Sequence, residues 1–161
     1  MSLEAAKELA PTGVLRAAIN MSNFLLVTGR TAGGDPDGVS PDMARELAKR
    51  LGVDLELIQY KTPGEVSDDA GKGIWDIGNI GAEPKRAEKI DFTAAYCEIQ
   101  STYMVPPGSK ITSLDQVDQT GNRIAVSARS AYDLWLERNI KKAELVRVDG
   151  IDASFDIFME K

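Results

Sequence analysis

The chain has 161 residues and a formal net charge of −6, and it contains no histidine. The absence of histidine excludes histidine-based triads, zinc sites of the HExxH type and imidazole acid–base chemistry. No basic run is longer than two residues, so we expect no nucleic-acid partner, because a duplex requires a clustered positive face. A hydrophobic fraction of 43% is enough for a buried core.

The single cysteine, Cys97, excludes an intrachain disulfide. Without a histidine to activate it, Cys97 is a poor nucleophile, and we expect it to be a small buried side chain. This cysteine usage fits a reducing compartment and equally a periplasmic protein that needs no disulfide. No apolar stretch reaches the roughly 18 residues of a membrane span, and the start of the chain lacks the layout of a signal peptide.

The first third of the chain has the pattern of a strand, a helix and a second strand. Residues 13–20 have strand character, and residues 53–60 alternate between apolar and polar side chains. Between them, residues 40–52 carry apolar side chains at helical spacing, with Ser40 expected as the N-cap and Gly52 as the end. This order predicts a parallel βαβ unit.

The loop at residues 31–38 contains the D-x-D-G pattern of part of a calcium-binding EF-hand. If Gly38 is the central glycine of that motif, Gly33 and Ala44 occupy positions that must supply oxygen ligands. We therefore expect no metal site here.

The same α/β alternation continues, less regularly, to the middle of the chain. The sequence predicts a weak helix at 63–73, a strand at 74–80, a short helix at 83–89 and a strand at 90–93. An extended segment follows at 97–108 and ends in a Pro-Pro-Gly turn.

A second α/β block follows this extended segment. Its expected elements are a short helix at 113–117, a strand at 123–127, a helix at 130–140, a strand at 144–148 and a helix from 152. We therefore divide the chain into a first α/β lobe at 1–98, a hinge strand at 99–102 and a second, incomplete α/β lobe at 103–161. A linker that is itself strand-like favours a stiff hinge.

Four segments in this order resemble the family 3 extracellular solute-binding proteins, the receptors of polar amino-acid ABC importers. They are "GVLRAAIN", "GVSPDMARELAKRLGVDLELI", "WDIGNIGAEPKRAEKIDFTAAY" and "SLDQVDQTGNRIAVSARSAYDLWL". The run "PKRAEKIDFTAAY" is the most specific, since it is similar to the family's arginine turn and the Asp-Phe-Ser/Thr run after it. The resemblance implies a type II periplasmic-binding fold, in which two α/β lobes close on a ligand by hinge bending.

The resemblance also implies a role for the turn after the strand at 74–80. The family's turn arginine grips the α-carboxylate of the ligand, and that role falls on Arg86. A guanidinium binds a carboxylate with two parallel hydrogen bonds, which gain strength in a partly dry cleft. Glu83 either receives a ligand ammonium or caps the short helix, and both readings stay open. Asn79 and Gly81 complete the expected ligand-binding set of this turn.

Three further ligand-binding residues are expected from the resemblance. Phe24 falls near the family's aromatic residue that packs on the ligand side chain, and its alternative role is packing in the core. In the second lobe, "SARSAYD" matches a turn that opens a helix, with Ser130 as N-cap and ligand contact. Arg129 is either a second anion contact or a solvated cation.

The chain departs from the family pattern in two ways. The turn lacks the family's usual hydroxyl residues, and the segment from Asp76 to Arg86 is shorter than usual. The chain also stops inside a helix of the second lobe, so we expect that lobe to be incomplete and to expose apolar edges.

The resemblance implies a periplasmic, exported receptor that binds an amino acid or related carboxylate and passes it to the membrane subunits of an ABC importer. We expect no catalytic residue, cofactor or metal, and a monomer if the chain is complete. One rival is a dehydratase of the cyclohexadienyl type on the same scaffold, with Glu83 as its acid. A second is the ligand-binding domain of a membrane sensor.

Overall fold

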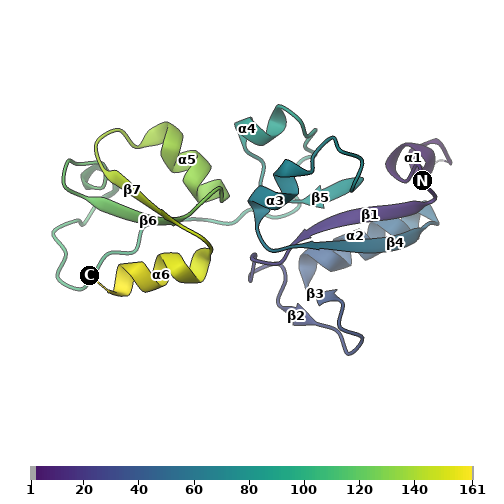
Figure 1. The fold of residues 1–161 in the computed structure, drawn as a ribbon, viewed down its shortest axis with the longest axis horizontal. Helices are drawn as coiled ribbons and strands as arrows, with labels where there is room; N and C mark the ends of the chain where they lie inside the picture. The colour runs from purple at the N-terminus through teal and green to yellow at the C-terminus, as the bar shows by residue number, and fades with distance from the viewer. Residues whose placement is uncertain (1–2, 161) are drawn as a thin grey trace. The chain divides into compact units, whose positions relative to one another are not determined.

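In a computed structural model, residues 3–160 are described, and the chain divides into two compact units between Ile90 and Asp91 (Figure 1). Among these residues, no helix has the length and apolarity that crossing a bilayer requires. Residues 99–102, expected as a hinge strand, carry no strand in the structure. A hinge at this position stays a prediction, and each unit is described by itself.

Unit 1 is built on a three-stranded parallel sheet with strand order β4-β1-β5. The central strand β1 (Val14–Asn20) pairs with β4 (Asp54–Tyr60) over its whole length and with β5 (Ile77–Asn79) near its end. Helix α1 (Leu3–Leu9) precedes β1. The expected βαβ unit is confirmed, with α2 (Val39–Leu51) between β1 and β4.

The start of α2 differs from the prediction. Gly38, not Ser40, is the N-cap, and Ser40 lies inside the helix with its backbone N–H donating to the carbonyl of Leu26 at 2.9 Å. Gly38 has φ of 128°, and a Cβ there would lie 2.7 Å from the Leu26 oxygen. Only glycine fits both this conformation and this close approach. Before it, β2 (Gly29–Arg30) and β3 (Pro36–Asp37) form a small antiparallel hairpin.

The core of unit 1 uses both faces of β1. Leu15, Ala17 and Ile19 point to the α2 side, where they pack with Ala44 and Ala48. These two alanines, rather than Met43, form the buried centre of the helix face, and Met43 is exposed. On the other face, Ala18 packs with Tyr60 and with the fully buried Val66.

Val66 belongs to α3 (Pro63–Asp68), which starts with a capping box between Thr62 and Glu65. The indole N–H of Trp75, a half-buried residue, donates to the Val66 carbonyl at 3.2 Å. Helix α4 (Pro84–Ala87) follows β5, as expected. The strand predicted at 90–93 is wrong, because β5 has no described neighbour beyond β1 and an apolar run forms a strand only beside a partner.

Unit 2 contains two parallel strands, β6 (Arg123–Ser127) and β7 (Glu144–Val148). Helices α5 (Ala131–Asn139) and α6 (Ile151–Met159) cover opposite faces of this pair (Figure 1), and the short 3-10 helix η1 (Leu114–Gln116) precedes it. The loop before β7 is fixed by Asp118, whose carboxylate accepts the backbone N–H groups of residues 141–143. These backbone bonds lower the pKa of Asp118.

Unit 2 leaves large apolar side chains in solvent. Trp135 on α5 is 48% exposed, and Phe155 on α6 is 50% exposed. Cys97 is also exposed, so the expectation that it is buried is wrong, because residues 91–105 form no regular element that could pack over it.

An ion pair joins β1 to the start of β5. The Asp76 carboxylate accepts hydrogen bonds from the backbone N–H of Arg16 at 2.9 Å and from its Nε at 3.0 Å. A second guanidinium nitrogen of Arg16 donates to the Gly73 carbonyl. Burial alone would raise the pKa of Asp76, but the hydrogen bonds and charge of Arg16 outweigh burial and lower it.

Asp76→Asn should therefore lower the free energy of unfolding at pH 7 by about 2 kcal/mol, the size of a lost charged hydrogen-bond pair. Because the pKa of Asp76 is lower in the folded chain, its contribution is present above the ordinary value of 3.8 and is lost as the pH falls through the folded-state pKa. Urea unfolding of both proteins should show a difference that shrinks below pH 3.8.

The matched control is Glu46→Gln, which removes an exposed pair with Arg50 on α2. It should leave the unfolding midpoint nearly unchanged, because exposed pairs contribute little. A loss equal to that of Asp76→Asn, or one that does not depend on pH, would contradict the assignment.

Candidate functional site

The parallel sheet of unit 1 has a point where its strand order reverses. From β1 the chain crosses to β4 on one side, and from β4 it crosses back to β5 on the other side of β1. In open parallel sheets, ligands bind outside the carboxyl ends of the strands at such a point. The segments that follow β1 and β5, residues 21–27 and 80–86, are therefore the candidate site of unit 1.

Arg86 is the buried cation of the segment after β5. It is only 4% exposed, and its Nη1 donates to the Gly81 carbonyl at 2.8 Å. Its backbone N–H donates to the Glu83 carbonyl at 2.9 Å. Arg86 is therefore not a solvated surface cation, because it closes the 81–86 turn and holds its guanidinium inside it.

Glu83 lies at the N-cap position of α4 and is half-buried. Its side chain makes no capping hydrogen bond, so the interpretation of Glu83 as a side-chain cap is wrong. Pro84 at the first helical position has no N–H, and the N–H groups of Arg86 and Ala87 donate to the backbone carbonyl of Glu83 rather than to its side chain. Contact between Glu83 and a ligand stays a prediction.

Asn79 ends β5 and has a partner inside the protein. Its Nδ2 donates to the carbonyl of Ser40 at 2.6 Å, and Ser40 is 3% exposed. This bond ties the carboxyl end of β5 to the first turn of α2. Asn79 thus orients the segment after β5 through a contact that the sequence did not predict.

Phe24 lies in the turn after β1 and is 62% exposed. The turn is closed by the backbone N–H of Val27, which donates to the Asn23 carbonyl at 2.8 Å. Phe24 is therefore not a core residue, and it follows the strand next to β5. Phe24 and Arg86 thus lie in the segments that leave the carboxyl ends of two neighbouring parallel strands, β1 and β5.

Two polar residues at this edge were missed from sequence. The Oδ1 of Asn20, the last residue of β1, accepts from the hydroxyl of Ser22 at 2.8 Å. At the end of β4, the hydroxyl of Tyr60 donates to Asp69 at 2.8 Å. Burial and this bond raise the pKa of Tyr60 to about 12. The available signal was a polar side chain at the end of a buried strand.

In unit 2, the predicted site residues lie in the turn between β6 and α5. Ser130 is the N-cap of α5, as predicted, with its Oγ accepting from the backbone N–H of Asp133 at 3.2 Å. Arg129 is exposed and has φ of 60°. Asp133, which is 5% exposed, was missed, although the S-x-x-D spacing at 130–133 is a capping signal.

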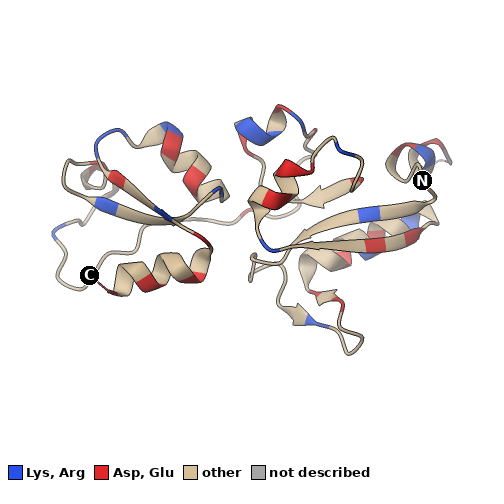
Figure 2. Ribbon diagram, viewed as in Figure 1, with Lys and Arg blue, Asp and Glu red and all other residues tan. Residues whose placement is uncertain are grey.

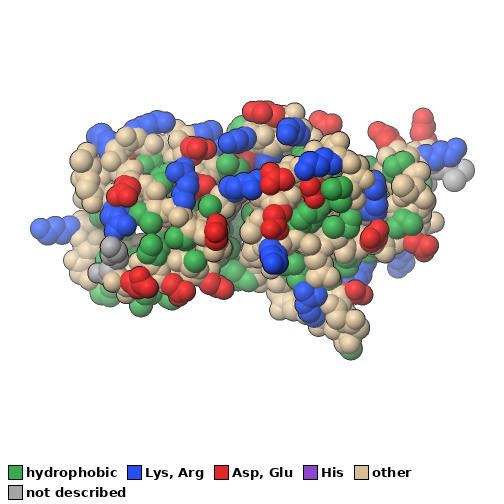
Figure 3. All heavy atoms as spheres, viewed as in Figure 1, with side chains coloured by type: hydrophobic (Ala, Val, Ile, Leu, Met, Phe, Trp, Pro, Cys, Tyr) green, Lys and Arg blue, Asp and Glu red, His purple; other side chains and the backbone are tan. Residues whose placement is uncertain are grey.

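Acidic and basic side chains are interspersed along the elements of each unit and on the face drawn as spheres (Figures 2 and 3). Over the part of the chain that the structure describes, no group of three or more acidic or cysteine side chains could hold a metal ion. The polar groups of the candidate site are thus an arginine, a glutamate, amides and backbone N–H groups.

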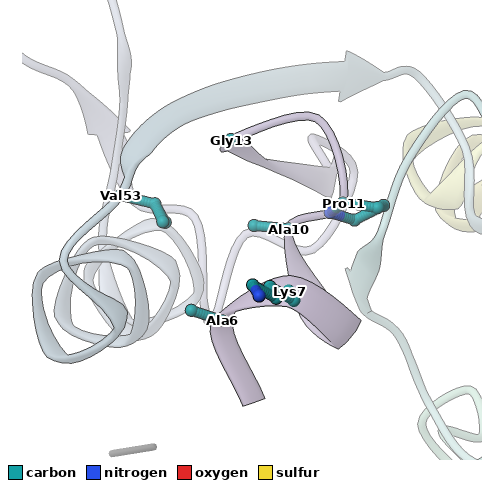
Figure 4. Close-up of a pocket in the computed structure, with 6 residues that line it drawn as sticks. All are labelled: Ala6, Lys7, Ala10, Pro11, Gly13 and Val53. Carbon is teal, nitrogen blue, oxygen red and sulfur yellow. The ribbon is translucent and has the colours of Figure 1, made fainter. Parts of the chain in front are cut away.

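A separate open pocket of about 290 Å³ lies beside α1 (Figure 4). Its lining includes Gly13 and Val53, which directly precede β1 and β4. It is therefore at the amino end of the sheet, opposite the candidate site. The other lining residues are Ala6, Lys7, Ala10 and Pro11.

Comparison with known families matches residues 18–160 to the bacterial extracellular solute-binding proteins, family 3. The L-cystine-binding protein TcyJ of Escherichia coli (strain K12) is 26% identical over 117 residues, which are 72% of this chain and 44% of that protein. The cyclohexadienyl dehydratase of Pseudomonas aeruginosa is 28% identical over 145 residues, which are 87% and 53% of the two chains. The chain spans about half the length of these relatives.

Two solved structures show the same fold. One is an ancestral amino acid-binding protein, a precursor of cyclohexadienyl dehydratase, with a TM-score of 0.78, 21% identity and coverage of 97% of this chain and 70% of that one. The other is the cysteine-binding protein of Campylobacter jejuni, with a TM-score of 0.70, 20% identity and coverage of 98% and 64%. The predicted α/β type II periplasmic-binding fold is confirmed.

Asn79→Ala should lower the free energy of unfolding by about 1 kcal/mol, because it removes the hydrogen bond to the Ser40 carbonyl. It should also speed hydrogen exchange at the start of α2, the element that this bond holds. Both can be measured on the ligand-free protein.

Asn139→Ala is the control, since the Nδ2 of Asn139 also donates to a backbone carbonyl but on the exposed end of α5. It should have a smaller effect on stability and none on α2. Unchanged exchange at α2 in Asn79→Ala would show that Asn79 does not hold the helix.

Proposed function

The chain belongs to the family 3 bacterial extracellular solute-binding proteins, and from this membership we propose that it binds a small polar solute, an amino acid or a related carboxylate. It acts as the receptor of an ABC importer and makes or breaks no covalent bond. The observation that carries the proposal is a buried arginine in the turn after β5, beside the reversal of strand order in the unit 1 sheet.

In this proposal, Arg86 receives the carboxylate of the solute. A guanidinium has five N–H donors in a fixed plane, and the Nη1 of Arg86 donates to the Gly81 carbonyl. Burial keeps the group rigid and partly dry, which strengthens a charged hydrogen bond. The cost of ordering the arginine is met when the protein folds, before the solute arrives.

Glu83 and Phe24 give the rest of the unit 1 site. Glu83 is half-buried in the same turn as Arg86, so a solute ammonium has an acidic partner close to the carboxylate partner. Phe24, which is exposed after β1, offers an apolar face to the solute side chain. One cation, one anion and one aromatic ring suit a zwitterion with a side chain of its own.

In unit 2, the turn at 127–130 supplies the second set of contacts. Ser130 opens α5, whose first N–H groups favour a negative charge. The side chain of Arg129 is exposed and adds positive charge to the same turn. Both residues are proposed ligand contacts.

The proposed mechanism is a shift of population between open and closed forms. A solute that touches both units favours the closed form by the contacts it makes only there. Residues 99–102 stay the proposed hinge; they lie in a segment without helix or strand that follows the boundary between Ile90 and Asp91.

The names of relatives support a polar amino acid as the solute. They include an L-cystine-binding protein and cysteine-binding proteins of Campylobacter jejuni and Neisseria gonorrhoeae. On the same family membership we also propose a periplasmic location and delivery of the solute to the membrane subunits of an importer. The solute and the importer subunits are thus the proposed partners of the protein.

A second candidate function is a dehydratase, which the likeness to the Pseudomonas aeruginosa enzyme favours. Such a reaction needs an acid that gives its proton to a leaving hydroxyl. Glu83 is the acidic residue of the proposed unit 1 site that could serve. We place this function second because the family consists mainly of solute receptors.

Arg86→Ala should weaken solute binding by more than tenfold, since a charged hydrogen-bond pair is worth about 1.5–3 kcal/mol. Arg86→Lys should lose part of this affinity, because lysine keeps the charge and lacks the planar fork. Calorimetric titration with L-cystine, L-cysteine, L-arginine and L-lysine measures both variants, and circular dichroism checks their fold.

Lys85→Ala is the matched control, because Lys85 is the exposed neighbouring cation in the same helix. It should bind like the wild type. Equal affinities of Arg86→Ala and Lys85→Ala would remove Arg86 from the site and leave it as a structural residue of the turn.

Incubation with prephenate or arogenate separates the two functions. We expect the protein to leave both compounds unchanged and to retain an amino acid through gel filtration. Turnover that disappears in Glu83→Gln would instead establish the dehydratase.

A further inference from the structure

We propose that Asp133 is a positioning residue that holds the 127–130 turn of unit 2 in its ligand-binding form. The expected effect on solute affinity rests on the proposed function. The role of Asp133 in fixing the conformation of the turn rests on the geometry alone. Asp133 itself is buried, and its carboxylate accepts a hydrogen bond from the backbone of the turn.

The turn is short and closely bonded. Ser127 ends β6, and its carbonyl accepts the hydroxyl of Ser130 at 2.7 Å. The backbone N–H of Ala128 donates to the Val148 carbonyl at the end of β7, at 2.8 Å. Three consecutive elements, β6, α5 and β7, are thus fixed to the same four residues.

Arg129 is the unusual residue of this turn. Among the described residues, it is the one non-glycine residue with positive φ, at 60°. An L-residue in this left-handed conformation is disfavoured because its Cβ approaches the following carbonyl oxygen. Arginine gives no local compensation of the kind that Asn or Asp provides, so a contact from elsewhere must hold the conformation.

Asp133 provides that contact. Its Oδ2 accepts the backbone N–H of Arg129 at 2.8 Å, and its Oδ1 accepts the Nε of Arg147 at 2.7 Å. Each carboxylate oxygen therefore has a charged or polar partner, although the Asp133 side chain is only 7% exposed. Arg147, on β7, orients the carboxylate from the strand side while Asp133 holds the turn.

A plain helix cap is the alternative role for Asp133. In a capping box, the acidic side chain at the third helical position accepts the N–H of the N-cap residue. The N-cap here is Ser130, yet the Asp133 carboxylate bonds the residue before it. The carboxylate of Asp133 accepts the backbone N–H of Arg129, the residue with positive φ, and therefore stabilises the turn rather than the end of the helix.

A double-mutant cycle with Arg129→Gly tests this inference, because glycine adopts positive φ without cost. Asp133→Ala alone should speed hydrogen exchange at the Arg129 and Ser130 amides of the ligand-free protein. It should also weaken solute binding by about five- to thirtyfold, the population change that corresponds to one left-handed residue. In the Arg129→Gly background, the same Asp133→Ala change should weaken binding by less than about threefold.

The probes are L-cystine, L-cysteine, L-arginine and L-lysine, each titrated against the full chain. Equal losses of affinity in both backgrounds would show a simple capping role and overturn the proposal. Unchanged exchange at Arg129 in Asp133→Ala would also overturn it. If the wild type binds none of these probes, the proposed function fails, and the exchange measurement alone decides whether Asp133 holds the turn.

Glu137→Gln is the matched control, since Glu137 lies on the same helix, is exposed and approaches Arg147 at 3.7 Å. It should leave exchange and affinity unchanged. If Asp133→Ala does not fold, Arg147→Gln serves instead, because it removes the partner that orients Asp133 and should speed Arg129 exchange in the same direction. No change in Arg147→Gln would count against the arrangement.

Discussion

The parallel pairing of β1 with strands on both sides is the constraint on which unit 1 depends. Because β4 and β5 both run parallel to β1, each connection must cross the sheet, and all three carboxyl ends come to one edge. The same pairing buries β1 on both faces, which explains its run of Ala17, Ala18 and Ile19 at 1% exposure or less. The polar residues Asn20 and Asn79 lie where β1 and β5 end.

The candidate site then follows from how each unit stiffens a turn. In unit 1, a buried arginine closes the turn on a carbonyl, and an asparagine fastens the strand end to α2. In unit 2, a buried aspartate holds a left-handed residue. Both devices use charged or amide side chains of the protein to fix the backbone, and a fixed backbone lowers the conformational cost of binding the proposed solute. The candidate residues lie in loops at the ends of strands, and side-chain hydrogen bonds fix the backbone of these loops although they contain no regular secondary structure.

Local patterns in the sequence predicted most of the helices and strands, but they did not predict the side-chain contacts that hold the turns. The helix at residues 40–52 and the strand at 53–60 follow from apolar spacing, which depends on neighbours in the chain. The strand expected at 90–93 failed because strand formation depends on a distant partner. Ser40 looked like an N-cap by type, but the approach of Leu26 to Gly38 shifted the helix start. The bond of Asn79 to Ser40 and the bond of Arg147 to Asp133 join residues that are 39 and 14 positions apart, so no local pattern could predict them.

The two tryptophans make each unit its own optical reporter. Trp75, in unit 1, is half-buried with its indole N–H bonded to the Val66 carbonyl, whereas Trp135, in unit 2, is 48% exposed. The chain holds 2 tryptophans in all, so intrinsic emission is a sum of a bluer, shielded component and a redder one open to aqueous quenchers. Iodide quenching would dim the second component first, and fluorescence decays could follow the melting of each unit separately without any label.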